Sequence, residues 1–382
     1  MYENTRLREK TEAGTRRRRL QALLDDVHRA GVPGVFAEVR QDDQVWQGAS
    51  GVADLATGRP VTTDMRQRVG SITKTFTAAA VLQQVEQGRI ALDAPIGRYL
   101  PHLVPGGRGE SVTVRMLLDH TSGLAEYLPA AFPSLAALPS LPDMSPQSLD
   151  DNRLRTFRPE ELIEMGLAAP TTGEPGGRPG SYSNTNYLLL GQLLAQVTGT
   201  TAEECITRSV IARAGLRHTF FPAGPRIEAS HPLMYEAMYG GIDPPRDYSV
   251  YDMSWVGPAA ALVSTVEDLN RFYAALLAGR IVDRSSLAQM LRTGPVDRFG
   301  ERIEYGLGLH RFTIPGCGSA WGSDGTVWGA QTMSMAKADG TRQMSIATNL
   351  VRWNEPDASG VPRSHPIDDT LARFYRLAMC DC

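Results

Sequence analysis

The chain has 382 residues and a formal net charge of −3, with 42% hydrophobic and 21% charged residues. A soluble globular protein of this length can bury a large core, and we expect two domains or subdomains. The sequence has neither a broad basic face for nucleic acid nor an apolar segment of transmembrane length, and we expect no metal and no cofactor.

Residues 1–19 are polar and charged, and they include the basic run Arg16–Arg19. No apolar core of a signal peptide follows them, so we expect a solvated tail or the first turn of a helix in a cytoplasmic protein. The cysteines lack the spacing of a metal site or a disulfide scaffold, which favours reduced thiols. They are Cys205, Cys317, Cys380 and Cys382.

The first structured elements are a helix, a hairpin and a second helix. Apolar residues recur at helical spacing over residues 20–27, and residues 35–40 and 45–48 are predicted to pair as two strands. An alanine-rich helix then runs over residues 71–88. Because this helix is apolar around most of its circumference, it should be buried at the centre of the molecule.

Residues 93–249 have a mainly helical pattern. A proline-rich stretch, residues 125–156, interrupts this region, and a stretch of that length is usually a lid, a binding loop or disordered. The predicted helices cover residues 112–120, 159–165, 187–197 and 202–214.

The C-terminal part combines strands with two helices. Helices are predicted at residues 265–278 and 367–378, and strands at 306–312, 330–337 and 343–348. An Asp339-Gly340 turn joins the last two strands. Strands at both ends of the chain predict a discontinuous α/β domain, residues 20–92 and 250–382, into which a helical domain of residues 93–249 is inserted.

Ser71 and Lys74 are the first candidate catalytic residues. In a helix they lie one turn apart on the same face, so their side chains can meet. Burial and the helix dipole both favour a neutral amine, which could accept the serine proton. The chain has only three lysines against a large excess of arginine, which cannot act as a base. The structural alternative is that Ser71 is a helix N-cap and Lys74 a surface residue.

A second Ser-x-x-Lys sequence, from Ser334 to Lys337, is predicted to lie in a strand. Side chains three positions apart in a strand point to opposite faces, so these two should not meet. Only the first copy therefore has the geometry for catalysis.

Two further segments could contribute to the same site. Tyr182-Ser183-Asn184 lies in a turn ahead of a helix, where the phenol could relay a proton and the amide could bind substrate. Residues 321–329 contain several glycines at the predicted start of a strand. The backbone there can approach a ligand closely and donate N–H groups to it. Taken alone, the first is better explained as a helix cap with a packed tyrosine. The second, taken alone, is compatible with an ordinary glycine-rich loop.

Together these segments resemble the penicillin-recognising serine hydrolases, in the branch of class C β-lactamases, D-alanyl-D-alanine carboxypeptidases, D-aminopeptidases, esterases and transacylases. The resemblance extends over nearly the whole chain. It includes residues 68–74, 88–93, 117–124 and 182–187. It implies an α/β (α+β) fold of the β-lactamase/transpeptidase type, with an antiparallel sheet flanked by the terminal helices and an all-helical domain. The site would lie between the two.

The resemblance also implies a role for each candidate residue. Ser71 would be the nucleophile, and Lys74 and Tyr182 would share the general-base role. The backbone N–H groups of Ser71 and Thr326 would form the oxyanion hole. The substrate-binding residues would be Asn184, Ser323, Asp324, Gly325 and Thr326.

The third motif departs from the family pattern. The family usually has Lys-Thr-Gly or His-Thr-Gly there, whereas this chain has Ser323-Asp324-Gly325. The cation that helps to bind a substrate carboxylate is missing, and an acid stands next to its place. We therefore expect neither penicillin nor a terminal D-alanine to be the preferred substrate.

The leading hypothesis is a cytoplasmic serine hydrolase or acyltransferase that moves an acyl group from an ester-type donor to water or an amine, in small-molecule or antibiotic biosynthesis. The expected partners are a small-molecule acyl donor and an amine acceptor. One alternative is a D-amino-acid amidase or aminopeptidase, in which Asp324 receives the substrate ammonium. Others are a D,D-carboxypeptidase and a sensor that acylates slowly or not at all.

Overall fold

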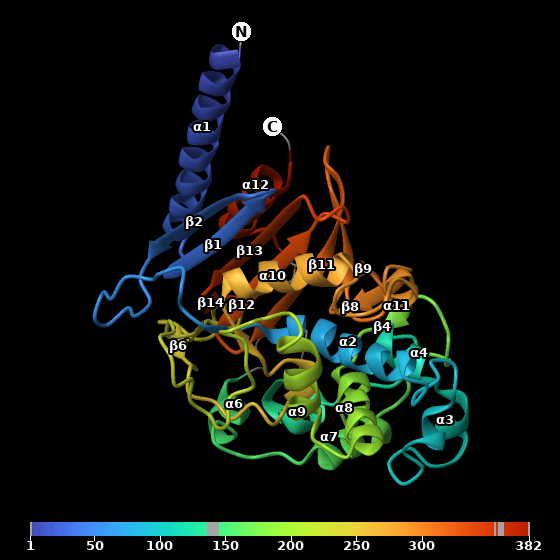
Figure 1. The fold of residues 1–382 in the computed structure, drawn as a ribbon. Coiled ribbons are helices and arrows are strands. Elements are labelled where there is room, and N and C mark those ends of the chain that lie inside the picture. The colour runs from blue at the N-terminus through green and yellow to red at the C-terminus, as the bar shows by residue number, and fades with distance from the viewer. Residues whose placement is uncertain (1, 136–144, 355–356, 358–362, 381–382) are drawn as a thin grey trace.

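The computed structural model describes residues 2–135, 145–354, 357 and 363–380 (Figure 1). Within those residues, nine strands form a central sheet in the order β2-β1-β13-β12-β11-β10-β9-β8-β4. Neighbours pair antiparallel, except that β4 runs parallel to β8. The strands are β1 (Gly34–Gln41), β2 (Gln44–Gly51), β4 (Gly180–Ser181), β8 (Gly294–Arg298), β9 (Glu301–Tyr305), β10 (His310–Ile314), β11 (Gly318–Val327), β12 (Ala330–Ala336) and β13 (Arg342–Thr348).

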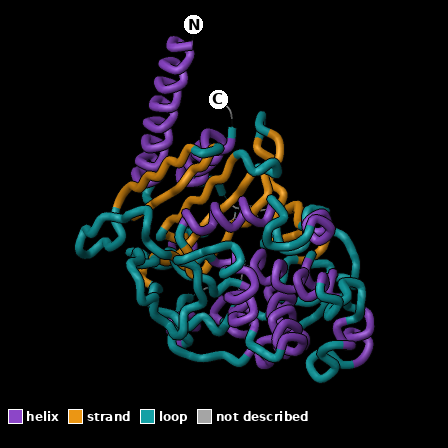
Figure 2. The backbone as a smooth tube through the Cα atoms, viewed as in Figure 1, coloured by secondary structure: helices purple, strands orange, loops and turns teal. Residues whose placement is uncertain are grey.

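Helices cover both faces of this sheet (Figures 1 and 2). α1 (Tyr2–Arg29) and α12 (Pro366–Met379) pack on one face, where Phe374 of α12 and Val35 of β1 belong to one buried apolar cluster. α10 (Val266–Leu277) packs on the other face, and its Asn270 donates to the backbone oxygen of Glu38 at 3.1 Å. Every residue of β13 is buried between the two layers.

Residues 1–19, for which a solvated tail or the first turn of a helix was expected, are helical from Tyr2 onward as the first part of α1, and this end projects from the body in Figure 1. Contacts of Arg16 hold this part of α1 against α12. Its guanidinium donates to the backbone oxygens of Leu377 at 2.8 Å and Ala378 at 3.0 Å, near the end of α12. The last carbonyls of a helix lack intrahelical partners, so a guanidinium there stabilises both helices.

A mainly helical region lies below the sheet in Figure 1 and surrounds α2 (Thr73–Glu86). The first twelve residues of α2 are buried, which confirms the predicted central helix. α8 (Asn184–Thr198) packs alongside it. The other helices are α3 (Gly106–Ser111), α4 (Val114–Leu118), α5 (Leu128–Ala131), α6 (Gln147–Asp151), α7 (Pro159–Ala168), α9 (Ala202–Ile206) and α11 (Arg284–Met290), with short 3₁₀ or π turns between them.

Short strands that the sequence did not predict tie this region to the sheet. β4 adds to β8 at the sheet edge, with Gly180 opposite Val296. Two-residue strands show no periodicity, so nothing in the sequence indicates them. The remaining short strands are β3 (Gln67–Arg68) paired with β7 (Val263–Ser264), and β5 (Tyr235–Glu236) paired with β6 (Arg246–Asp247) and β14 (Leu350–Val351). The division into two domains stays a prediction.

The proline-rich stretch contains short helices, α5, the 3₁₀ turn η3 (Pro133–Leu135) and α6, while residues 136–144 lie outside the described residues. Phe132 anchors its first part. The Phe132 ring packs edge-on against Trp255, with centroids 5.4 Å apart, and against Trp328 at 5.6 Å. Such aromatic contacts bury a large apolar area and favour one arrangement of the chain.

The prediction of reduced thiols is wrong for two of the cysteines. Cys317, after β10, and Cys380, after α12, form a disulfide with Cα atoms 5.3 Å apart, while Cys205 is free and buried. The two cysteines are 63 residues apart in sequence, and only the packing of α12 on the sheet brings them together. Structural disulfides are typical of oxidising compartments, so this bond does not support the expected cytoplasmic location. None of the helices in the described ranges is long and apolar enough to cross a membrane.

Candidate active site

Ser71 lies in the 3₁₀ turn η1 (Gly70–Ile72) that leads directly into α2. The N-cap of α2 is Ile72, so Ser71 does not have the capping role that was its structural alternative. Lys74 lies in the first turn of α2, and its Nζ is 3.0 Å from Ser71 Oγ. The predicted meeting of these two side chains is present in the structure.

Lys74 is completely buried, and its amine makes further hydrogen bonds. Nζ donates to Asn184 Oδ1 at 2.7 Å and to the backbone oxygen of Ala259 at 3.1 Å. Burial lowers the pKa of Lys74 to about 7; Glu126 opposes this shift and Arg298 reinforces it. A large fraction of Lys74 is therefore neutral near pH 7, as a base must be.

Tyr182 follows β4, and its ring lies next to Lys74. The centre of its ring is 4.9 Å from Lys74 Nζ, which in turn is 3.0 Å from Ser71 Oγ. Burial raises the pKa of Tyr182, while the nearby Ser71 hydroxyl and Arg298 act in the opposite direction. The phenol is therefore protonated at rest, and it is placed to pass a proton between Ser71 and a departing group.

His120 supports Tyr182 from behind, although no role was predicted for it. Its imidazole packs on the Tyr182 ring with centroids 4.2 Å apart and on Tyr305 at 4.8 Å. Its Nδ1 accepts the backbone N–H of Ser183 at 3.3 Å. Burial, then Lys74, lowers the pKa of His120 well below its ordinary value, so the ring is neutral.

Glu126 is a second residue at the site that sequence reasoning missed. Its Oε2 accepts hydrogen bonds from the backbone N–H of Asn184 at 2.8 Å and from Asn184 Nδ2 at 2.9 Å. This fixes the Asn184 amide with its oxygen toward Lys74. Burial raises the pKa of Glu126, and these hydrogen bonds and Lys74 oppose the rise. The residue falls inside the stretch predicted to be a loop, and no pattern linked it to Asn184.

The strand β11 lies directly against the turn that carries Ser71. A Cβ added to Gly70 would be 2.5 Å from the backbone nitrogen of Thr326, and one added to Gly325 would be 2.7 Å from that of Ser71. The φ of Gly70 is +55°, a conformation that also favours glycine. Two glycines thus let the two backbone N–H groups approach each other, the arrangement that an oxyanion hole needs.

The third-motif residues have partners of their own. Ser323 is buried, and its hydroxyl donates to the backbone oxygen of Asp324 at 3.0 Å. Arg298, from the end of β8, donates to Asp324 Oδ1 at 2.7 Å, and His310 Nε2 is 3.7 Å from the same oxygen. Burial alone would raise the pKa of Asp324, but Arg298 and His310 lower it to about 2. A cation is therefore present beside the third motif, supplied by a different strand.

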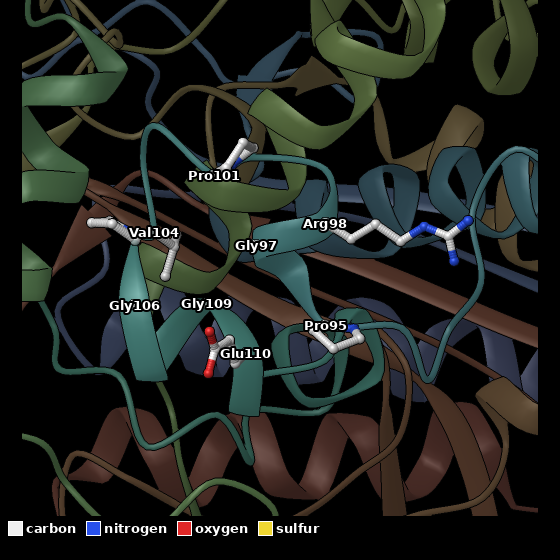
Figure 3. Close-up of a pocket in the computed structure, with 9 residues that line it drawn as sticks. Pro95, Gly97, Arg98, Pro101, Val104, Gly106, Gly109 and Glu110 are labelled. Carbon is white, nitrogen blue, oxygen red and sulfur yellow. The ribbon is translucent and has the colours of Figure 1, made fainter.

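A separate surface hollow lies away from these residues (Figure 3). It has a volume of about 450 Å³ and is lined by residues between Pro95 and Glu110. None of its lining residues belongs to the cluster around Ser71. In the described part of the chain, no group of three or more His, Cys, Asp or Glu side chains is arranged to hold a metal ion.

The beta-lactamase family model matches residues 17–365, so the chain belongs to this family of serine hydrolases. A D-stereospecific amidohydrolase from Streptomyces sp. is 31% identical, with a TM-score of 0.77 over 92% of this chain and 96% of that one. The D-amino acid amidase from Ochrobactrum anthropi SV3, complexed with L-phenylalanine amide, has the same fold, with a TM-score of 0.77 at 24% identity over 94% and 97% of the two chains. The predicted fold class and family are confirmed.

Curated relatives include a D-aminopeptidase from Cereibacter sphaeroides, 27% identical over 308 residues, which are 80% of this chain and 55% of the relative. The esterase EstB from Burkholderia gladioli is 33% identical over 208 residues, 53% of this chain and 51% of EstB. The chain thus spans about half the length of these curated relatives. The comparisons support hydrolase activity.

Proposed function

We propose that this protein hydrolyses amides and small esters of D-amino acids through an acyl-enzyme on Ser71. The observation that carries the proposal is the 3.0 Å contact between Ser71 Oγ and the buried amine of Lys74, whose pKa is lowered to about 7 by burial. A neutral amine at that distance can remove the serine proton. The similarity to the D-stereospecific amidohydrolase from Streptomyces over 92% of the chain and to the D-aminopeptidase supports the D-amino-acid substrate class.

In the proposed acylation step, Lys74 takes the Ser71 proton as Oγ forms a bond to the substrate carbonyl carbon. The negative charge on the carbonyl oxygen is stabilised by the backbone N–H groups of Ser71 and Thr326. The bond to the leaving amine or alcohol then breaks, and the proton from Lys74 reaches the leaving group through Tyr182. Water attacks the ester by the reverse route, with its proton returned to Ser71 Oγ.

Glu126 is the proposed partner of the substrate ammonium, in place of Asp324. Asp324 already holds Arg298 at 2.7 Å, so its charge is balanced within the protein. Glu126 accepts three neutral N–H groups, two from Asn184 and the backbone N–H of Leu128 at 3.2 Å, and a carboxylate has about four acceptor positions. A charge-assisted hydrogen bond from a substrate ammonium would occupy the acceptor position of Glu126 that is left.

Acyl transfer to an amine is a second candidate. The observation that favours it is the packing of Phe132 from the proline-rich stretch onto Trp255 and Trp328, the second of which is two positions after Thr326. Exclusion of water from an acyl-enzyme favours attack by an amine. A place in antibiotic biosynthesis stays a prediction. The remaining alternative is a sensor, which would form the same acyl adduct on Ser71 but release no product.

The test is to incubate the protein with D- and L-phenylalanine amide and with a p-nitrophenyl ester, with and without added amines, and to follow product and intact mass. The proposal expects faster hydrolysis of the D-amide and an acyl adduct that maps to Ser71. Turnover that accelerates with amines, giving a new amide, would establish the transferase instead. An adduct with no turnover would favour the sensor, and activity without any requirement for Ser71 would refute the proposal.

A further inference from the structure

Phe299 occupies an unfavourable position at the tip of the β8–β9 hairpin. Its side chain is 65% exposed, and its backbone φ of +48° is uncommon for a residue other than glycine. Exposing a phenyl ring to water and holding its backbone in the left-handed region both cost free energy. Among the described residues the other exposed large apolar side chains are Val45, Leu55 and Leu154.

The Phe299 ring is held beside the catalytic cluster. Its centroid is 6.0 Å from that of the Tyr182 ring, at an angle of 57°. The preceding residue, Arg298, is bound to Asp324 of β11, only two positions before Thr326. The ion pair is mostly buried, with 17% and 20% of the two side chains exposed. It therefore ties the hairpin tip to the strand that carries the proposed oxyanion hole.

The chemistry of the site indicates which part of the substrate lies against the Phe299 ring. A leaving amine or alkoxide needs a proton as its bond to carbon breaks, and Tyr182 is the phenol whose ring lies 4.9 Å from Lys74 Nζ, the group that takes the Ser71 proton. The leaving group must therefore lie against Tyr182. Because Phe299 flanks the same ring, the next atoms of the leaving group meet Phe299. The acyl part would then extend toward Asn184, which contacts Lys74, and toward Glu126, which contacts Asn184.

We propose that Phe299 and Tyr182 form a leaving-group subsite that selects aromatic or other apolar leaving groups. This inference rests on the proposed acyl-enzyme function and specifies the leaving half of its substrates. Two aromatic faces set at an angle can hold a third ring by edge-to-face and offset contacts. Arg298 is already paired with Asp324, so the subsite offers no free cation to a leaving group that carries a carboxylate.

The test compares substrates that share an acyl group and differ in the leaving group: D-phenylalanine amide, which releases ammonia, and D-phenylalanine anilide, which releases aniline. For Phe299→Ala, kcat/KM for the anilide should fall about 5- to 10-fold, the scale of one lost ring contact, while the value for the amide stays within about 2-fold. Phe299→Tyr should keep the anilide activity. Val45→Ala, on β2 at the opposite end of the sheet, removes another exposed apolar side chain and should change neither substrate.

An equal fall for both substrates would overturn the inference, because Phe299 would then act by positioning Tyr182. An unchanged anilide rate would overturn it as well. If the wild-type protein cleaves neither substrate, the D-amino-acid proposal fails, and the subsite is tested with ethyl acetate and phenyl acetate, which share the acetyl group. Selective loss of phenyl acetate activity in Phe299→Ala supports the subsite, and retention of that activity overturns it.

Discussion

The chain contains the same Ser-x-x-Lys spacing twice, and the serine and lysine side chains meet in only one of the two copies. Ser71 and Lys74 lie in a helical turn, where Nζ is 3.0 Å from Oγ. Ser334 and Lys337 belong to the β12 region, where Ser334 Oγ bonds to Ser345 Oγ at 2.7 Å and Lys337 Nζ donates to the backbone oxygen of Cys317. Spacing alone does not create a nucleophile, because the secondary structure decides whether the two side chains meet.

The largest expected effect comes from removing each serine. Ser71→Ala should lower kcat by at least about 1,000-fold, because the nucleophile is lost. Ser334→Ala removes a buried hydroxyl pair and should leave kcat within about 2-fold, with a loss of about 1 kcal/mol in the free energy of unfolding. The rate of p-nitrophenyl ester hydrolysis measures the effect on kcat, and urea unfolding measures the effect on the free energy of unfolding. A Ser71→Ala protein with near wild-type rates would contradict the assignment of Ser71 as the nucleophile.

Removing each lysine should give the next largest difference. Lys74→Met fills the buried site with an apolar side chain of similar length and should lower the acylation rate about 100- to 10,000-fold, the usual contribution of a general base. Lys337→Met should leave that rate unchanged. Circular dichroism of both variants verifies folding. Equal losses in the two variants would mean that Lys74 acts through stability and not as a base.

Glu126 and Asp324 provide a second contrast, between a carboxylate with spare acceptor positions and one that is already paired. Glu126→Gln should lower kcat/KM for D-amino-acid amides about 10-fold or more, since a charge-assisted hydrogen bond to the ammonium is lost. The N-acetylated forms of these amides have no ammonium and should be much less affected. Equal losses for both substrate forms would place Glu126 in support of Asn184 only.

The smallest effect on activity is expected from the disulfide, which is next to the second Ser-x-x-Lys copy. Cys317→Ser should lower the free energy of unfolding by about 2–4 kcal/mol and leave kcat within about 2-fold. Cys205 is free, so Cys205→Ser is the matched control. Denaturant unfolding with and without a reductant checks the prediction. An unchanged unfolding free energy in Cys317→Ser would contradict a stabilising bond.

The elements that the sequence predicted well are those with local patterns. The buried helix after Ser71, the hairpin of β1 and β2 and the amphipathic α12 each show a clear period or turn. The meeting of Ser71 with Lys74 was predictable because it lies within one helical turn. Tyr182 and Asn184 were predictable through the family resemblance and not from their spacing.

The features that the sequence did not reveal depend on contacts between distant segments. Glu126 binds an asparagine 58 positions away, Arg298 reaches Asp324 across 26 positions, and Cys317 bonds to Cys380 across 63. No period or turn signal links such pairs, because only the packed sheet and helices bring them together. The pairing of Asp324 with Arg298 could not be predicted for this reason, since Arg298 comes from another strand.

The central claim is that a neutral Lys74 activates Ser71, and the pH dependence of acylation tests it most directly. With an uncharged ester as substrate, kcat/KM should rise with pH around a midpoint near 7, because protonated Lys74 cannot accept a proton. Glu126→Gln should move the midpoint to lower pH, since a carboxylate that favours the ammonium form is removed. A flat profile between about pH 5 and 9, or a midpoint near the ordinary lysine value of about 10.4, would contradict the account.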